Sequence, residues 1–326
     1  MPKRFLSIVL AALASFCAIS SSAESIADYP SRPVTIIVPF PPGGNTDISG
    51  RILAQALTAR LGKSFIVENK GGAGGIIGAK AAAAAAPDGY TLLLGGSGPT
   101  TISPLIFKKA GYDVARDFVP ISLLSLAPIA IVVHPSFPAK TVADLIAIAK
   151  AKPDQVTVAS AGNGSSSHLS NELFQLMAGV KLRHVPYRGG GPAVADLVSG
   201  QVNVLFDQVT STMPYVTQGS LRALAVTTRK RLPAFPDVPT VDESGVKGYE
   251  VESYTGLLAP AGTPPEIVQK LNAEIVKVLN DPQIRAKFTD LGAEPVSMSP
   301  KAFGEYLRKE NDRWGAVVRK AAIKVD

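Results

Sequence analysis

Short runs of β-branched and aliphatic residues alternate along this 326-residue chain with longer segments of helical period. Residues 46–61, for example, repeat their apolar positions every three or four residues and follow the run 34–38 after a turn. Parallel strands need a crossover connection, which is usually a helix, so this alternation favours βα units and a largely parallel sheet. The chain is therefore predicted to be an α/β protein. The predicted strands are 34–38, 65–67, 91–94, 129–133, 157–160, 202–206 and 223–227.

Two helix starts carry recognisable capping patterns. Thr263 precedes two prolines and is followed by Glu266 at the third helical position, and Thr141 is followed by Asp144 in the same way. The sequence predicts that each threonine caps its helix, and that the helix after Thr263 covers residues 264–279.

The first 23 residues have the pattern of a secretory signal. Lys3 and Arg4 precede an apolar stretch, and small residues stand before Ala23. We expect cleavage after Ala23 and a periplasmic mature protein. The single cysteine, Cys17, lies in this segment, so a mature chain starting at residue 24 has no disulfide, thiol nucleophile or cysteine-ligated metal.

The charges give little indication of a macromolecular partner. Lys and Arg number 33 against 26 Asp and Glu, and the excess is scattered rather than gathered in one patch. The densest basic run, Arg229 to Arg231, is three residues long, which disfavours nucleic acid as a partner. The excess of basic residues agrees with an anionic ligand, but it is weak evidence for one.

About 300 mature residues are enough for two domains. Two extended apolar segments, 118–128 and 246–260, are predicted to be the places where the chain crosses between the two domains. We therefore predict a discontinuous first domain, 24–124 and 249–326, and an inserted second domain, 125–248. Two connections of this kind form a hinge around which the domains close on a ligand.

Four polar or glycine-rich turns follow predicted strands and precede predicted helices. In open α/β sheets ligands bind at this edge, where helix N-termini offer free N–H groups to anions. The alternative is structural, because tight turns and helix caps need the same residue types in any α/β fold. The four turns are 39–47, 95–98, 160–168 and 206–208.

Catalytic, metal and cofactor sites find less support. The three histidines, His134, His168 and His184, lack the spacing of a metal site, and no metal or cofactor is predicted. The turns 62–64 and 71–78 miss the phosphate-binding and dinucleotide-binding patterns. A serine hydrolase using Ser97 or Ser165 with His168 is an alternative, but 95–99 lacks the second glycine of a nucleophile elbow.

The order and spacing of several stretches resemble the Bug, or TctC-like, family of extracytoplasmic receptors associated with tripartite tricarboxylate transporters. The stretches are Tyr29-Pro30, residues 38–47, Val67-Glu68-Asn69-Lys70, and residues 87–91, 185–189 and 259–264. The resemblance implies a two-domain Venus-flytrap fold of the type II periplasmic binding class. It also implies a small carboxylate ligand, such as a di- or tricarboxylate, an acidic amino acid or an aromatic carboxylate, no enzymatic activity, and the membrane subunits of such a transporter as partners. A sensor feeding a membrane signalling partner stays open as an alternative.

The resemblance also suggests which residues meet the ligand. In the first domain they are Pro42, Gly43, Gly44, Thr46, Asp47, Gly96 and Ser97, and in the second Gly162, Asn163, Gly164, Ser165, Ser166 and Asp207. The chain departs from the family at Tyr254, because family members often carry tryptophan near this position, and the departure concerns the aromatic wall of the pocket.

None of the four turns contains Arg or Lys, so backbone N–H groups, hydroxyls and water are expected to hold a carboxylate. Arg51, four residues after Asp47, is expected to pair with it, and Asp207 to accept a hydrogen bond at the far end of the ligand.

Overall fold

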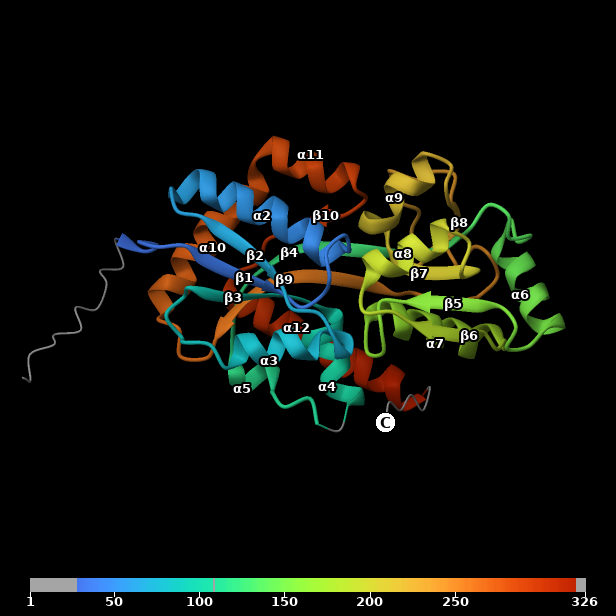
Figure 1. Ribbon diagram of the computed structural model, residues 1–326, viewed down its shortest axis with the longest axis horizontal. Helices are drawn as coiled ribbons and strands as arrows, with labels where there is room; N and C mark the ends of the chain where they lie inside the picture. Colours follow the sequence, from blue (N-terminus) through green and yellow to red (C-terminus); the bar gives the residue numbers. More distant parts are fainter. Residues whose placement is uncertain (1–27, 108, 321–326) are drawn as a thin grey trace, which may run out of the picture.

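Two α/β lobes share one continuous sheet in the computed structural model, which describes residues 28–107 and 109–320 (Figure 1). The expected signal peptide, 1–23, lies outside the described residues. No helix within the described residues is both long and apolar enough to cross a membrane.

The chain builds most of the first lobe, crosses to the second, and returns. The outgoing part contains β1 (Val34–Val38), α2 (Asn45–Leu61), β2 (Phe65–Asn69), η2 (Ala73–Gly75), α3 (Ile76–Ala83), β3 (Thr91–Gly96), the π-helix η3 (Gly98–Ile102), α4 (Ser103–Ile106) and α5 (Val114–Asp117). The second lobe contains α6 (Val142–Ala151), β5 (Thr157–Ser160), α7 (Ser166–Ala178), β6 (Arg183–Pro186), α8 (Gly190–Val198), β7 (Val204–Gln208), α9 (Val209–Thr217) and β8 (Arg222–Val226). The returning part contains β9 (Glu252–Pro260), α10 (Pro265–Asn280), α11 (Pro282–Asp290), β10 (Glu294–Pro295) and α12 (Pro300–Lys320).

A long strand, β4 (Phe118–Val133), joins the lobes. The sheet runs in the order β2-β1-β3-β9-β4-β7-β5-β6, and β8 and β10 also pair with β4. Up to Pro128, β4 pairs with β9; from Ile129 it pairs with β7. Both predicted crossings therefore contain extended strands, paired antiparallel to each other where the lobes meet. The predicted domain boundaries near residues 125 and 248 stay a prediction.

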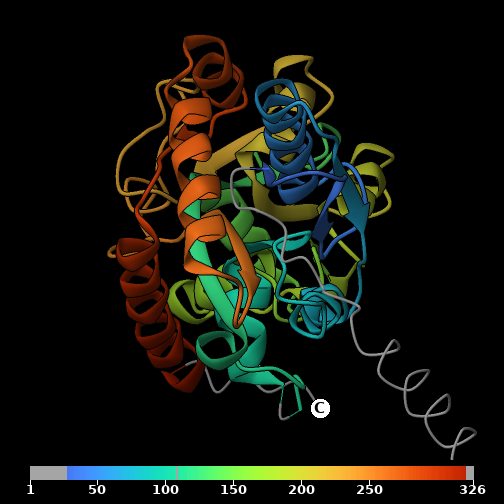
Figure 2. The ribbon, with the colours of Figure 1, turned by 90° about the vertical axis from the view of Figure 1, so that its left-hand side faces the viewer.

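Each half of the sheet is covered on both faces, as the alternation of side chains along its strands requires. In the first lobe, Ile36 and Leu92 pack toward α2 and α10, whereas Ile37 and Leu93 pack toward α3 and α12. Figure 2 shows α2 (blue) and α3 (cyan) on opposite sides of the strands of this lobe. In the second lobe, β4 alternates in the same way between one core that includes Phe174 of α7 and another that includes residues of α8.

The last helix, α12, contacts both lobes. Phe303, near its start, belongs to a core cluster of the first lobe. Trp314, which is 1% exposed, belongs to the cluster that holds Phe174 of the second lobe. The helix passes beneath the junction of the lobes in Figure 1. A third chain segment therefore accompanies the two crossing strands.

The local predictions are largely confirmed. The strands 34–38 and 157–160 have the predicted bounds, and Thr141 forms the capping box with Asp144. The other predicted strands overlap observed ones. The prediction for Thr263 was wrong: α10 has Pro264 as its N-cap, and the Thr263 hydroxyl donates to Pro260 O instead. Proline has no side-chain acceptor, so this helix starts without a side-chain cap.

Candidate ligand-binding site

A small cavity lies between the lobes, and both lobes line it. Its volume is about 30 Å³, room for two or three water-sized polar groups. None of the described residues that line it is charged. The first lobe contributes Phe40, Gly44, Asn45, Thr46, Gly96, Ser97, Gly98, Ser253 and Tyr254, and the second contributes Ala161, Ser165, Ser166, Gly190 and Gln208.

Four α-helices within the described residues begin at this cavity. Gly44 is the N-cap of α2, Ser165 the N-cap of α7, and Gln208 the N-cap of α9, while Gly190 is the first residue of α8. The first N–H groups of a helix have no partner within the helix, and the helix dipole places partial positive charge there. The walls therefore combine free donors with a positive potential, without any cationic side chain.

The loop of the first lobe, residues 39–44, is held by Asp47, the third residue of α2. The Gly43 N–H donates to Asp47 Oδ2 over 3.0 Å, and Arg51 Nε donates to the same oxygen over 3.0 Å. Asn69 Nδ2 at the end of β2 donates to Asp47 Oδ1 over 2.9 Å. Burial disfavours the charged carboxylate, but these hydrogen bonds outweigh it and lower the pKa of Asp47. The predicted Arg51 pair is confirmed as a salt bridge.

Ser97 and Ser253 of the first lobe line the cavity, and their Oγ atoms lie 3.1 Å apart. The hydroxyl of Tyr254, which also lines the cavity, contacts Thr100 and Thr101 on the π-helix η3. Asn45 donates from Nδ2 to Thr255 Oγ1, and its buried Oδ1 has no protein partner.

The loop of the second lobe, residues 161–165, is capped by serine. Ser165 Oγ accepts the His168 N–H and donates to Gly162 O. At the end of β7, Gln208 Nε2 donates to Ser166 Oγ over 2.8 Å and reaches Ser253 Oγ over 3.5 Å. Gln208 thus connects the two walls.

Two further contacts join the lobes, each through a backbone carbonyl. Ser103 Oγ of the first lobe shares its hydrogen between Gly74 O of its own lobe, 3.0 Å away, and Gly164 O of the second lobe, 3.2 Å away. Pro42 O lies so close to Gly191 that a side chain at Gly191 would collide with it. The described conformation is therefore one with the lobes in contact.

Six of the thirteen predicted site residues line the cavity: Gly44, Thr46, Gly96, Ser97, Ser165 and Ser166. The others lie in the same loops or behind them. Pro42 meets the second lobe, Gly43 and Asp47 brace the first loop, and Gly162, Asn163 and Gly164 form the turn that leads to Ser165. The ligand contacts of all thirteen stay predictions.

Asp207 lies behind the wall. Its side chain is fully buried, and a side chain at Gly190 would stand 2.5 Å from Asp207 Oδ2. Burial raises the pKa of Asp207 to about 6, although Ser211 Oγ and the Gln208 backbone donate to it. Its Oδ1 has no protein partner.

Eight lining residues were not among those predicted. Phe40, Asn45, Gly98, Ala161 and Gln208 stand in or next to turns that the sequence does single out. Gly190 starts a helix soon after β6, which was not among the predicted strands, so the strand-to-helix rule did not reach it. Ser253 and Tyr254 lie on the crossing strand β9, where no sequence pattern marks a binding site.

A larger groove, about 520 Å³, lies in the first lobe between η3, α5 and α12. Its lining includes Tyr112, Arg308 and Asp312 but no residue of the second lobe. Lobe closure cannot enclose a ligand there, so size alone is a poor guide to the site. Among the described residues, no group of three or more His, Cys, Asp or Glu is placed to hold a metal.

The geometry of His168 disfavours the hydrolase alternative. Its ring bonds the Gly164 N–H through Nδ1, and Nε2 faces Glu172, so neither ring nitrogen has a bond to Ser165 Oγ among the described contacts. Burial, with a further contribution from neighbouring His184, lowers the pKa of His168 to about 3, which makes it a weak base.

The model of the tripartite tricarboxylate transporter family receptor matches residues 50–323. Protein BugT of Bordetella pertussis is 38% identical over 320 residues, which cover 97% of this chain and 98% of BugT. A solved R. palustris protein with adipate has 38% identity and a TM-score of 0.89, covering 91% of this chain and 99% of that one. MatC from Rhodopseudomonas palustris with bound malate has 37% identity and a TM-score of 0.86, covering 89% and 100%. The periplasmic binding protein BugD has 39% identity and a TM-score of 0.88, covering 91% and 99%.

Proposed function

The chain belongs to the tripartite tricarboxylate transporter receptor family of periplasmic solute-binding proteins, and on this premise we propose that it binds a small organic carboxylate between its lobes. The observation that carries the proposal is that four α-helices begin at one uncharged cavity, and that the loops leading into two of them, α2 and α7, are held by side-chain hydrogen bonds. Free N–H groups and dipole ends attract an anion without an arginine. The solved relatives with malate and adipate support the same ligand class.

Neutral recognition has a consequence for release. A carboxylate bound by arginine is held by a strong charge-assisted pair, whereas N–H groups, hydroxyls and water give a weaker, geometry-dependent site. Such a site forms fully only when Ser165, Ser166 and Gln208 of the second lobe meet Gly44 and Thr46 of the first. We infer that closure about β4 and β9 completes the site, and that opening releases the ligand.

We further infer that the ligand leaves unchanged and passes to membrane subunits of a tripartite tricarboxylate transporter. Export to the periplasm with cleavage after Ala23 belongs to the same proposal. Two observations support a binding role over catalysis. The described residues that line the cavity include no charged acid or base, and the described contacts of the His168 ring nitrogens are with the Gly164 N–H and Glu172 rather than with a serine hydroxyl.

Thermal unfolding with matched ligands tests the proposal. Malate, succinate, adipate and benzoate are each added to the purified mature protein, with succinamide as the uncharged control. At about 100 times the dissociation constant, linkage gives about 2.7 kcal/mol of stabilisation. For a chain of this size that raises Tm by roughly 5 to 10 °C. No shift with any carboxylate, or an equal shift with succinamide, would contradict the proposal.

A further inference from the structure

His168 occupies in the second lobe the position that Asp47 occupies in the first. Each is the third residue of the helix that begins at the cavity, α7 or α2. Each accepts a hydrogen bond from the glycine just before the N-cap, Gly164 or Gly43, and both glycines have positive φ, +83° and +88°. The two loops are therefore fixed by the same backbone geometry, one through a carboxylate and the other through an imidazole.

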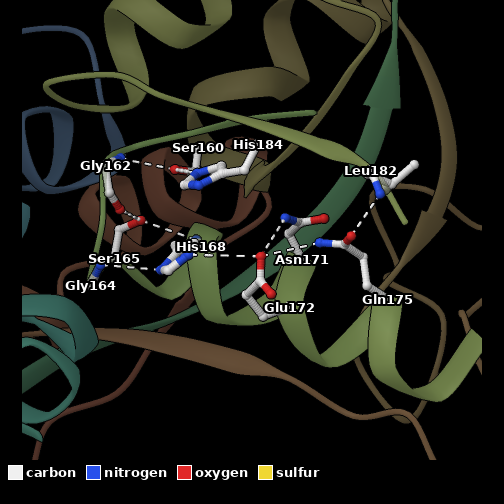
Figure 3. A network of polar contacts seen from close by, with 10 residues as sticks. All are labelled: Ser160, Gly162, Gly164, Ser165, His168, Asn171, Glu172, Gln175, Leu182 and His184. Carbon is white, nitrogen blue, oxygen red and sulfur yellow. Dashed lines mark hydrogen bonds and ion pairs between the residues drawn. The ribbon is translucent and has the colours of Figure 1, made fainter. Parts of the chain in front are cut away.

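The bond to Gly164 defines the state of the His168 ring. A backbone N–H can only donate, so His168 Nδ1 accepts it, over 3.3 Å, and carries no proton. The ring proton is then on Nε2, which faces Glu172 Oε1 at 3.8 Å (Figure 3). The acceptor that shapes this loop exists only while the imidazole is neutral.

A second histidine supports the first. The His184 ring from β6 stacks on His168 with centroids 4.5 Å apart and planes 17° apart. His184 Nε2 contacts Ser160 Oγ over 2.6 Å, and the same oxygen accepts the Gly162 N–H. Figure 3 shows the turn from Ser160 to Ser165 at the left of the two rings, with His184 next to Ser160 and His168 below it, next to Ser165 and Gly164. One ring thus reaches each end of the turn.

We propose that His168, backed by His184, is a positioning residue that holds the 161–165 loop in its binding geometry through a neutral imidazole acceptor. The proposal rests on the proposed carboxylate-binding function. The loop does two things that need this geometry. Ala161 and Ser165 line the cavity, and Gly164 O shares the Ser103 hydroxyl of the first lobe with Gly74 O. Losing the acceptor therefore loosens one cavity wall and one contact that closes the lobes.

The surroundings keep both rings uncharged. Burial, and for His168 the neighbouring ring, lower the pKa of His168 to about 3 and that of His184 to about 4. Glu172, on α7 itself, is the one charged side chain at ion-pair distance from either ring within the described part of the chain, and burial raises its pKa. The neighbouring strand β5 contributes Ser160, and β6 contributes His184. A proton on His168 Nδ1 would point at the Gly164 N–H and break the bond.

Matched variants test the acceptor. Asn places its side-chain oxygen where His carries Nδ1, so His168→Asn keeps an acceptor for Gly164 and His168→Leu does not; both lose the stacked ring. Calorimetry at pH 7.5, with malate and adipate as probes, should show His168→Asn within about 3-fold of wild type. His168→Leu should bind at least about 10-fold more weakly, because a buried N–H is left unpaired. His134→Asn is the control, since His134 bonds Ser136 on an exposed loop of the same lobe.

The comparison of folded variants is decisive in either direction. Equal binding by wild type and His168→Leu, or equally weak binding by His168→Asn and His168→Leu, would overturn the acceptor role. If wild type binds no carboxylate at all, the proposed function fails and the inference is judged without ligand.

Long-range ¹H–¹⁵N spectra of the wild-type imidazoles test the inference without a ligand. They also test it in the case where His168→Leu fails to fold. At pH 6, His168 should show an unprotonated Nδ1 and a proton on Nε2, with a titration midpoint below pH 5. A protonated Nδ1 or an imidazolium at pH 6 would overturn the inference whatever the protein binds.

Discussion

The two lobes brace their cavity loops at equivalent positions with opposite chemistry. In the first, Asp47 is ionised and receives hydrogen bonds from Gly43, Arg51 and Asn69. In the second, neutral His168 accepts one weak hydrogen bond and relies on a stacked ring. Charge-assisted hydrogen bonds are roughly twice as strong as neutral ones. The first loop is therefore the stiffer wall, and the second is the wall that adapts when the lobes close.

The two loops also lose their stabilising hydrogen bonds over different pH ranges. The lowered pKa of Asp47 keeps its bracing bonds intact until the solution is more acidic than the ordinary carboxyl value of 3.8. The histidine pair loses its contribution over a higher range, because unfolded histidine takes up protons near pH 6.5 while the folded pair resists them. Mild acid therefore acts on the second lobe first.

The largest effect is expected from removing the stronger brace. Asp47→Leu leaves the Gly43 N–H and the Asn69 amide without their acceptor, and should lower the free energy of unfolding by about 3 kcal/mol. Urea unfolding measures this loss. Arg51→Ala should cost under about 1 kcal/mol, because the Arg51 side chain is half exposed. If Asp47→Leu costs no more than His168→Leu, the first loop is not the stiffer one.

The acid range of stability sharpens the comparison next. For His168 the folded pKa, about 3, lies below the unfolded value of 6.5, so its contribution is present above pH 6.5 and is lost as pH falls. The loss is at most about 1.4 kcal/mol per pH unit, or about 2 kcal/mol from pH 7.5 to 5. In urea unfolding, the free energy of unfolding of His168→Asn should therefore fall by about 2 kcal/mol less than that of wild type between pH 7.5 and 5. Asp47→Asn, which changes a group titrating at lower pH, should keep the wild-type slope.

A third change tests whether the first loop can yield at all. Gly191 lies inside α8 and is not part of the cavity lining, but a side chain there would collide with Pro42 O across the lobes. Alanine suits the helix, so Gly191→Ala should leave the unliganded protein as stable as wild type while opposing closure. Malate or adipate binding should weaken about 10-fold by calorimetry. Gly304→Ala in α12, whose nearest neighbour would be 3.6 Å away, is the control. Unchanged binding by Gly191→Ala would mean that the Pro42 loop moves freely.

Sequence patterns locate the loops but predict only part of the contacts that hold them. The strand-to-helix turns containing Gly44, Ser97 and Ser165 are readable because alternating βα units place such turns at one edge of a sheet. The Arg51 pair is also readable, because i and i+4 side chains share a helix face. The stacking of His168 on His184 depends on the pairing of β5 with β6. Both strands have four residues, but β6, with Arg183, His184 and Pro186, is too polar to appear as a strand. Ser253 joins the site because β4 and β9 cross between lobes side by side, which no local pattern encodes.

The smallest expected effect concerns the charge behind the second wall. Asp207 is buried under Gly190, and its raised pKa, about 6, leaves it ionised at pH 8. A negative charge there opposes a bound carboxylate across the wall, so Asp207→Asn should tighten malate binding roughly 3-fold at pH 8. Folding is preserved because Asn keeps an acceptor for Ser211. As pH falls through 6, wild-type Asp207 takes up a proton and the two proteins should converge. The ratio of their dissociation constants at pH 8, 6.5 and 5 cancels the titration of the ligand itself. A ratio that stays constant with pH would show that Asp207 acts through packing rather than charge, and a variant that binds more weakly at every pH would place the carboxylate in direct contact with the ligand.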